Sequence, residues 1–395
     1  MDARLYVDNA ATSFPKPPEV IEAMRRYAET VGASAGRGAY REAVETGEIV
    51  ADCRRRLAKL IHAETPKQVV FTLNCSEALN LALKGVLRGG DHVVATSMEH
   101  NSILRPLSAL VGSRGITVTH VEADPHTGLV DPAAVGAAVT PRTRLIACVH
   151  ASNVTGALQP VELIAAEARR RGILMLVDAA QSAGHVPIDV QAMRIDLLAL
   201  PGHKGLMGPL GTGALYIRPG LECDMSTLVE GGTGSVSEEP VQPEFLPDKF
   251  EAGSHNAIGL AGLGAALAWI EQRGLAALRE HDLALSRRFL ERAANCDGLT
   301  VYGPREAQRR VAVFAVRVAG FEPAELAMVL ETEFGILSRS GIQCAPLAHR
   351  TIGTLDDGGT TRLSFGAFNT IEDVDRCTAA LRQLAVSAVM DIRQK

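Results

Sequence analysis

The stretch "QVVFTLNCSEALNLALKGVLRGGDHVVATSM", residues 68–98, decides the fold class of this chain. Its two ends, 68–73 and 91–98, are short runs rich in Val and other apolar residues, as in β-strands. The section between them, 76–87, repeats apolar residues at helical spacing. Neither strand alternates apolar with polar residues, which is typical of strands buried on both faces. The unit predicts an α/β protein whose parallel sheet lies between helices.

The same pattern continues after this stretch. Helical segments are expected at 102–115 and 161–172. Five more strands are expected at 116–124, 143–152, 173–181, 196–204 and 211–219. Together these segments predict a large domain with a mostly parallel seven-stranded sheet, which we place at 15–255.

The pattern changes after about residue 255. A long apolar helix at 257–274 precedes an alternating strand at 310–320, and "TRLSFGAFNT" adds a strand before a closing helix. We therefore expect a smaller α+β domain at 256–395. Residues 1–14 are expected to be an N-terminal segment that packs near the active site.

Composition excludes several classes of protein. The chain has 395 residues and a net charge of −5, so no basic surface for nucleic acid is expected. The N-terminus has acidic residues and no signal-peptide core, and no apolar run is long enough for a membrane span. The seven cysteines are odd in number and form no CxxC pair, so neither a disulfide framework nor a metal site is expected. A cytoplasmic location is predicted.

In sheets of this kind, ligands bind at the carboxyl ends of the strands. The helix after the first strand begins at "NCSE", where the free amides of Cys75 and Ser76 and the Ser76 hydroxyl favour a phosphate. The plain alternative is that Asn74 or Ser76 is only an N-cap. This position is therefore a candidate phosphate site.

Two charged residues follow neighbouring strands of the pattern. Asp178 ends an apolar strand and needs a cation or hydrogen bonds if buried, which a pyridinium N–H would supply. Lys204 lies in the Gly-rich loop "PGHKGLMG", where desolvation would lower its pKa and make it a nucleophile. A structural salt bridge and a solvated turn are the alternatives. A phosphate site, an acid and a lysine together indicate pyridoxal phosphate.

Seven motifs in order resemble the class V aminotransferase family of fold-type I pyridoxal phosphate enzymes, and specifically its group II cysteine desulfurases. The motifs are "YVDNAATSFPKP", "SMEHNS", "VDAAQSAGHVPIDV", "PGHKGLMGPLGTGALY", "KFEAGSHN", "RSGIQCAPLAH" and "TRLSFGAFNT". The resemblance covers nearly the whole chain. It implies conversion of L-cysteine to L-alanine, with the sulfur held as a persulfide on Cys344.

The resemblance also implies roles for single residues. Lys204 would be the Schiff-base lysine, His100 would stack on the ring, and Asp178 would bind the ring nitrogen. Other cofactor contacts are assigned to Asn153 and Gln181 at the phenolic oxygen and to Cys75, Ser76 and His203 at the phosphate. Ser254 would reach the phosphate in a neighbouring subunit, which implies a homodimer with shared sites. Substrate contacts are assigned to Arg362, Arg339 and Asn153.

Two departures from the family pattern involve three residues. Pro201 stands where a phosphate-binding serine is usual, and Cys75 and Ser76 stand where two threonines are usual. The backbone donors survive both changes, but the phosphate loses hydroxyl contacts. Cofactor affinity or geometry is therefore expected to differ from the family norm.

Cys344 separates the possible activities. It lies in a loop with a following Pro, and Arg339 and His349 are near enough in sequence to lower its pKa. Catalytic use of Cys344 implies a desulfurase that hands sulfur to an acceptor protein, commonly in iron–sulfur assembly, with L-selenocysteine as a further substrate. If Cys344 is not catalytic, the chain is a class V aminotransferase or lyase. A non-catalytic dimeric scaffold is the third alternative.

Overall fold

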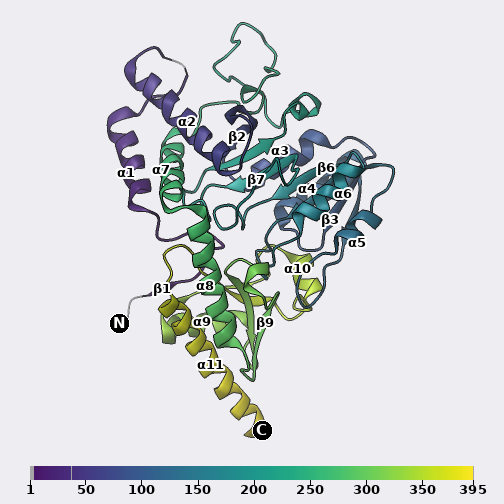
Figure 1. Ribbon diagram of the computed structural model, residues 1–395, viewed down its shortest axis with the longest axis vertical. Coiled ribbons are helices and arrows are strands. Elements are labelled where there is room, and N and C mark those ends of the chain that lie inside the picture. The colour runs from purple at the N-terminus through teal and green to yellow at the C-terminus, as the bar shows by residue number, and fades with distance from the viewer. Residues whose placement is uncertain (1–3, 37, 395) are drawn as a thin grey trace.

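A seven-stranded sheet forms the centre of the larger part of the computed structural model, which describes residues 4–36 and 38–394 (Figure 1). From edge to edge its strands are β2 (Val69–Thr72), β8 (Gly213–Ile217), β7 (Leu197–Pro201), β6 (Leu174–Asp178), β5 (Thr143–Val149), β3 (His92–Thr96) and β4 (Thr117–Val121). Only β8 is antiparallel to its neighbours within this sheet. The predicted mostly parallel seven-stranded sheet is confirmed.

Helices cover both faces of this sheet (Figure 1). On one face, α3 (Cys75–Val86) and α4 (Asn101–Arg114) share a core with alternate strand residues such as Val93 and Leu176. On the other face lie α2 (Arg41–Leu60), α5 (Pro132–Ala137), α6 (Val161–Arg170) and α7 (Ala257–Arg273). The intervening strand residues, such as Val94 and Val177, point to that second core. Both strand faces are buried, which explains why these strands show no polar alternation.

The strands of the quoted stretch lie farther apart than their sequence suggests. β2 pairs with β8, and β3 lies between β5 and β4, so four strands separate β2 from β3. The helix between them, α3, begins and ends one residue earlier than the predicted helix at 76–87. Asn74 caps it by accepting the Glu77 N–H at 2.9 Å.

A second, antiparallel sheet forms the C-terminal part, in the order β12 (Arg339–Gly341), β13 (Thr360–Ser364), β10 (Val313–Val318) and β9 (Leu299–Tyr302). A separate core joins this sheet to α8 (Leu275–Ala293), α9 (Pro323–Phe334) and α11 (Ile371–Gln394). The short helix α10 (Pro346–Thr351) follows β12. The division of the chain at residue 255 stays a prediction, and α7, which follows that point, packs in the core of the large sheet.

The N-terminal residues run between the two sheets. β1 (Leu5–Tyr6) pairs in parallel with β11 (Ile336–Leu337), and Asp8 then forms a bridge to Ser364 of β13. The chain continues into α1 (Pro18–Arg26), which packs on α7. Among the described residues, none of the helices has the length and apolar character needed to span a membrane.

A buried arginine fastens the C-terminal part to a turn after β5. Arg310 is fully buried and donates to the carbonyls of Thr155 (2.8 Å), Val313 (2.6 Å) and Pro304 (2.7 Å). Gly156 lies in the same contact with a φ of +75°, and a Cβ there would lie 2.5 Å from the Val313 carbonyl oxygen. Backbone packs against backbone here, so only glycine fits.

We expect Gly156→Ala to lower the free energy of unfolding by about 3 kcal/mol or more, because it adds a backbone clash to the strain of a positive φ. Gly172→Ala is the matched control, since Gly172 has a φ of +68° and open space around it. That variant should lose about 1 kcal/mol, from the strain alone. Urea unfolding measures both, and equal losses would contradict the packing argument.

Candidate active site

One cavity lies at the carboxyl edge of the large sheet, beyond the ends of β5, β6 and β7 and at the N-termini of α3 and α4. It gathers eight of the residues singled out in the sequence. They are Cys75, Ser76, His100, Asn153, Asp178, Gln181, His203 and Lys204. Strand ends and helix starts meet here because each segment of the sheet runs in the same direction, apart from β8.

One end of the cavity is rich in hydrogen-bond donors. Asn74 caps only the amide of Glu77, so the amides of Cys75 and Ser76 stay at the open end of α3. The Ser76 hydroxyl lies 2.6 Å from the hydroxyl of Ser102, which also lines the cavity. Sequence analysis did not predict Ser102, although it lies two residues after His100. Its hydroxyl therefore adds a second hydrogen-bonding group beside that of Ser76.

His203 lies at the same cavity and has an unused hydrogen-bonding atom. Its Nδ1 is buried and has no partner. Burial, with the nearby Lys204 and Lys16, lowers the pKa of His203 to about 4, so the ring is neutral at pH 7. A buried polar atom without a partner is costly, so this nitrogen indicates space for a ligand group.

Asp178 and Lys204 also line this cavity. Asp178 is buried and accepts the Ala180 N–H at 2.8 Å and the Cys75 thiol at 3.6 Å. Burial raises the pKa of Asp178, while these hydrogen bonds and Lys204 oppose the shift. Burial lowers the pKa of Lys204, so its amine is closer to the neutral, nucleophilic form than an exposed lysine. Burial and Asp178 raise the pKa of Cys75, which stays a thiol.

Two amides and an imidazole complete the walls of the cavity. His100 caps α4, and its Nδ1 accepts the Ser102 N–H at 3.0 Å. Burial lowers the pKa of His100 to about 4, so Nε2 carries its proton. Gln181 donates to the Ala10 carbonyl at 2.8 Å, and Asn153 donates to the Gln343 carbonyl at 2.6 Å. The Asn153 Oδ1 is buried without a partner in the same cavity.

The Cys344 loop lies beside this cavity. Cys344 is exposed, with a φ of +59°, and its carbonyl accepts the Asn101 N–H at 2.7 Å, directly after His100. Arg362 is buried on β13, pairs with Asp8 at 2.6 Å and donates to the Asn153 carbonyl at 3.1 Å. Arg339 lies opposite Arg362 on β12 and is exposed. The C-terminal part therefore places Cys344 and the two arginines beside the cavity, although none of the three is among the residues that line it.

The predicted effect of His349 on Cys344 is wrong. The His349 ring is buried, its Nε2 lies 2.7 Å from Gln343 Oε1, and its Nδ1 lies 2.7 Å from the Thr354 hydroxyl. Burial lowers the pKa of His349 to about 4, so it carries no charge at neutral pH. Sequence proximity did not predict this, because the loop turns Cys344 outward and His349 inward.

The N-terminal segment forms hydrogen bonds with the loop that carries Lys204. The carbonyl of His203 accepts from Lys16 Nζ (2.9 Å), the Ser13 amide (3.0 Å) and the Thr12 hydroxyl (3.1 Å). Burial lowers the pKa of Lys16 to about 8. These contacts fix the residue directly before Lys204, and no local sequence pattern indicated them.

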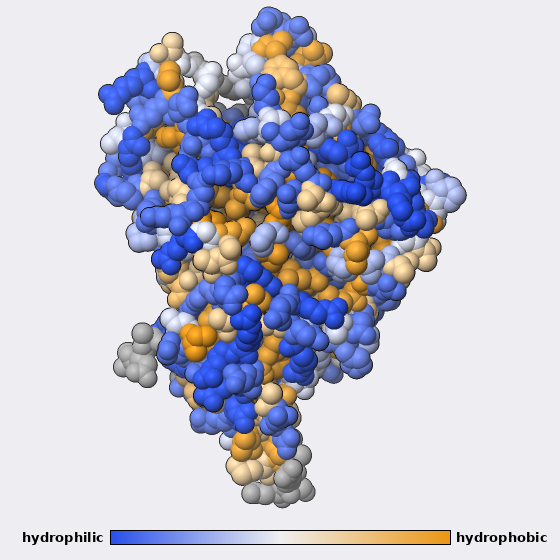
Figure 2. Space-filling model, viewed as in Figure 1, coloured by the Kyte–Doolittle hydropathy of each residue, from blue (hydrophilic) through white to orange (hydrophobic). Residues whose placement is uncertain are grey.

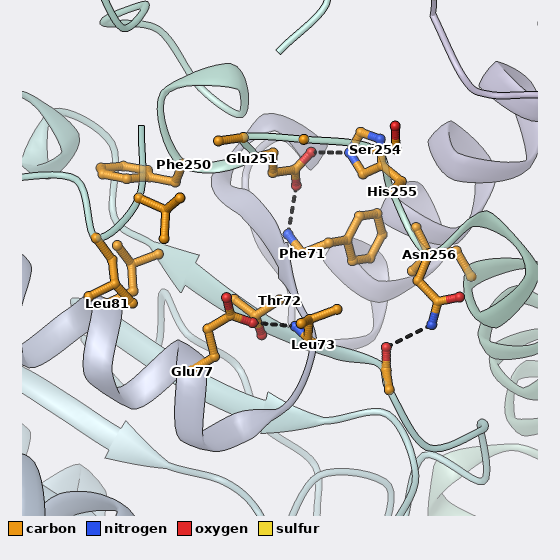
Figure 3. Close-up of a pocket in the computed structure, with 16 residues that line it drawn as sticks. Phe71, Thr72, Leu73, Glu77, Leu81, Phe250, Glu251, Ser254, His255 and Asn256 are labelled. Atoms are coloured by element: carbon orange, nitrogen blue, oxygen red, sulfur yellow. Dashed lines mark hydrogen bonds and ion pairs between the residues drawn. The ribbon is translucent and has the colours of Figure 1, made fainter. Parts of the chain in front are cut away.

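Ser254 does not line the Lys204 cavity. It is exposed and lines a separate groove with Phe71, Leu73 and Val229 (Figure 3). Glu251, three residues before Ser254, accepts hydrogen bonds from the Phe71 amide at 2.6 Å and from His255 Nε2 at 2.7 Å. Both of its carboxylate oxygens also bind the Arg54 guanidinium. This buried network fixes the Ser254 segment on the edge strand β2.

The cavity fits pyridoxal phosphate. The free amides of α3, the unpartnered His203 nitrogen and the Ser76–Ser102 pair suit a phosphate. Asp178 suits a protonated ring nitrogen, and the Lys204 amine suits an aldehyde carbon. The orphaned Asn153 oxygen is a further acceptor on the wall of the cavity.

Comparison with known proteins agrees with this arrangement. Residues 5–377 match the family described as aminotransferase class-V. The chain belongs to the class-V aminotransferase family.

Several similar proteins are named as cysteine desulfurases or probable cysteine desulfurases. A probable cysteine desulfurase from Methanothermobacter thermautotrophicus is 36% identical over 96% of this chain and 94% of its own. A cysteine desulfurase from Yersinia pestis is 32% identical over 96% of this chain and 93% of its own. The apo structure of a cysteine desulfurase from Thermococcus onnurineus superposes with a TM-score of 0.91, at 33% identity, over 97% of this chain and 95% of that one. The class-V resemblance predicted from the motifs is confirmed.

Buried neutral histidines should make this class-V enzyme sensitive to acid. Burial lowers four histidine pKa values from 6.5 to about 4, those of His100, His150, His203 and His349. As the pH falls, these histidines take up protons near pH 6.5 in the unfolded chain but only near pH 4 in the folded protein. The free energy of unfolding should therefore fall as pH decreases from 6.5 to 4. Glu99, whose pKa burial raises to about 8, and Asp178 act in the opposite direction but are outnumbered.

Urea unfolding between pH 7 and pH 4.5 measures this dependence. His150→Gln is the test variant, since His150 is buried and lies outside the lining of the cavity. It should reduce the slope by about one proton, or about 1.4 kcal/mol per pH unit. An unchanged slope would show that His150 does not contribute.

Proposed function

We propose that the protein is a pyridoxal phosphate-dependent cysteine desulfurase that converts L-cysteine to L-alanine and holds the sulfur on Cys344. The observation that carries the proposal is the placement of an exposed thiol beside the lysine cavity. The Cys344 carbonyl is bound to Asn101, and the neighbouring Gln343 carbonyl is bound to Asn153 of the cavity wall. The names of the relatives support the same activity.

The residues have separate tasks in this proposal. Bound pyridoxal phosphate would supply an electron sink for the substrate Cα. Cys75, Ser76 and His203 would hold its phosphate, Asp178 would hold its ring nitrogen, and His100, Asn153 and Gln181 would line its ring. Arg362 binds the substrate carboxylate as a planar guanidinium, with Arg339 and Asn153 nearby. Lys204 would hold the cofactor and would move the substrate Cα proton, which its lowered pKa favours.

Sulfur transfer takes place at Cys344. Its thiolate attacks the substrate sulfur, an S–S bond forms, and the substrate Cβ–S bond breaks. The Cβ gains a proton and leaves as the methyl group of alanine, so cysteine and the enzyme thiol become alanine and the enzyme persulfide. The exposure of Cys344 allows an acceptor protein, commonly one serving iron–sulfur assembly, to take the outer sulfur. L-selenocysteine is a further proposed substrate, because its C–Se bond is weaker.

We also propose a cytoplasmic location. A thiol nucleophile needs a reducing compartment, and all seven cysteines of this chain are free.

Cys344→Ala should reduce alanine and sulfide release from L-cysteine on the order of 100-fold or more, because no thiolate can take the sulfur. The lysine–cofactor absorption band should remain. Cys223→Ala is the matched control, since Cys223 is also exposed, and it should keep wild-type activity. Mass spectrometry of cysteine-treated wild type should find one extra sulfur on the Cys344 peptide. Full activity in Cys344→Ala would instead favour an aminotransferase or lyase.

We further propose that two copies of the chain share their sites. The Ser254 groove is open and apolar, and Leu73 and Val229 on its walls are 58% and 56% exposed (Figure 3). The projecting segment before α7 carries further hydrophobic residues, visible in orange at the top of Figure 2. A second copy would cover this surface and receive Ser254 at its cofactor phosphate.

Val229→Asp should raise the dimer dissociation constant about tenfold or more, because it buries a charge in the interface. Leu163→Asp is the control, since Leu163 is similarly exposed but lies on α6. Sedimentation velocity across a dilution series measures both variants. A monomeric wild type, or a Val229→Asp protein that dissociates no more readily than wild type, would contradict this dimer.

A further inference from the structure

Two consecutive residues of the Cys344 loop have an unfavourable backbone conformation. Gln343 has a φ of +44° and Cys344 a φ of +59°, and neither is glycine. Left-handed conformation costs a side-chain-bearing residue about 1–2 kcal/mol. Such a pair persists only where surrounding contacts hold it.

The Gln343 side chain supplies those contacts. It is buried, and its Nε2 donates to the Thr360 carbonyl of β13 at 2.8 Å. A carbonyl only accepts, so the amide nitrogen must face Thr360 and Oε1 must face His349, which is 2.7 Å away. The backbone carbonyl of Gln343 accepts from Asn153. The side-chain nitrogen, the side-chain oxygen and the backbone carbonyl of Gln343 are therefore all hydrogen-bonded.

The orientation of Gln343 also fixes the proton on His349. Because Gln343 Oε1 is an acceptor, His349 Nε2 must carry hydrogen. Its Nδ1 then accepts from the Thr354 hydroxyl at 2.7 Å. His349 is buried in the last turn of α10, so the ring is held by the helix as well as by both hydrogen bonds.

We propose that Gln343 and His349 are positioning residues for the sulfur-accepting thiol, a role that rests on the proposed desulfurase function. The Thr354–His349–Gln343 chain clamps the loop at the residue before Cys344. Thr360 ties the clamp to the strand that carries Arg362, and Asn153 ties it to the cofactor cavity. These contacts fix the positions of the thiol, the substrate-carboxylate site and the cavity relative to one another.

His349→Phe tests the clamp by removing the N–H donor while keeping a flat, buried ring. We expect kcat for alanine release to fall about tenfold or more, because the nucleophile loses its alignment. KM for L-cysteine and the affinity for pyridoxal phosphate should change less than twofold, since Arg362 and the cavity remain. His349→Gln places an N–H near the position of Nε2 and should restore most of kcat.

A matched control separates positioning from general loss of packing. His92 is also buried, with both ring nitrogens bound to threonine hydroxyls, but it lies on β3. His92→Phe should lose stability comparably and keep wild-type kcat. Should His349→Phe fail to fold, Gln343→Leu removes the clamp from its other end and should show the same loss of kcat.

Hydrogen exchange gives a readout that is independent of desulfurase activity. The peptide containing residues 341–346 should exchange at least tenfold faster in His349→Phe, but not in His92→Phe. Unchanged exchange, wild-type kcat in His349→Phe, or failure of His349→Gln to restore kcat would each overturn the proposal. If Cys344→Ala keeps full activity, the desulfurase function fails, while the exchange result still decides whether the clamp holds the loop.

Discussion

The burial of opposite charges at one edge of the large sheet is the constraint on which this structure depends. Asp178 and Arg362 are almost fully buried, and the charges of both act on Lys204. Isolated buried charges are prohibitively costly, so each requires a partner. Arg362 has Asp8, and Asp178 has the Ala180 amide and the Cys75 thiol. The Lys204 amine has no hydrogen-bonding partner among the described contacts, and burial lowers its pKa although Asp178 opposes the shift.

Supporting these charges requires three distant parts of the chain. The large sheet supplies Asp178 and Lys204, the small sheet supplies Arg362, and the N-terminal segment supplies Asp8. The same N-terminal segment secures the His203 carbonyl through Thr12, Ser13 and Lys16. The site is therefore a product of tertiary packing between sheets, and neither sheet alone completes it.

Local pattern predicted most of the large sheet and its cavity. The helix expected at 76–87 is observed at Cys75–Val86, because apolar spacing and an Asn cap are both encoded locally. Cavity residues could be predicted because the strand-end rule converts positions along the chain into proximity. Strand order could not be predicted in the same way, since apolar strands such as β2 and β8 carry no signal of direction or neighbour. The Asp8–Arg362 pair and the inward turn of His349 were missed for the same reason, because both depend on long-range packing.

The contacts of the N-terminal segment have a consequence for synthesis of the protein. Asn9 binds the carbonyl of Ser364, 355 residues later, so this segment docks on a strand that is synthesised long after it. At the usual rate of translation, roughly 5–20 residues per second, that interval is on the order of tens of seconds. Until β13 is made, a nascent chain has neither Arg362 nor the contacts that surround Cys344. Chains that still lack β13 are thus unable to mobilise sulfur, and the activity begins only after this strand has been made.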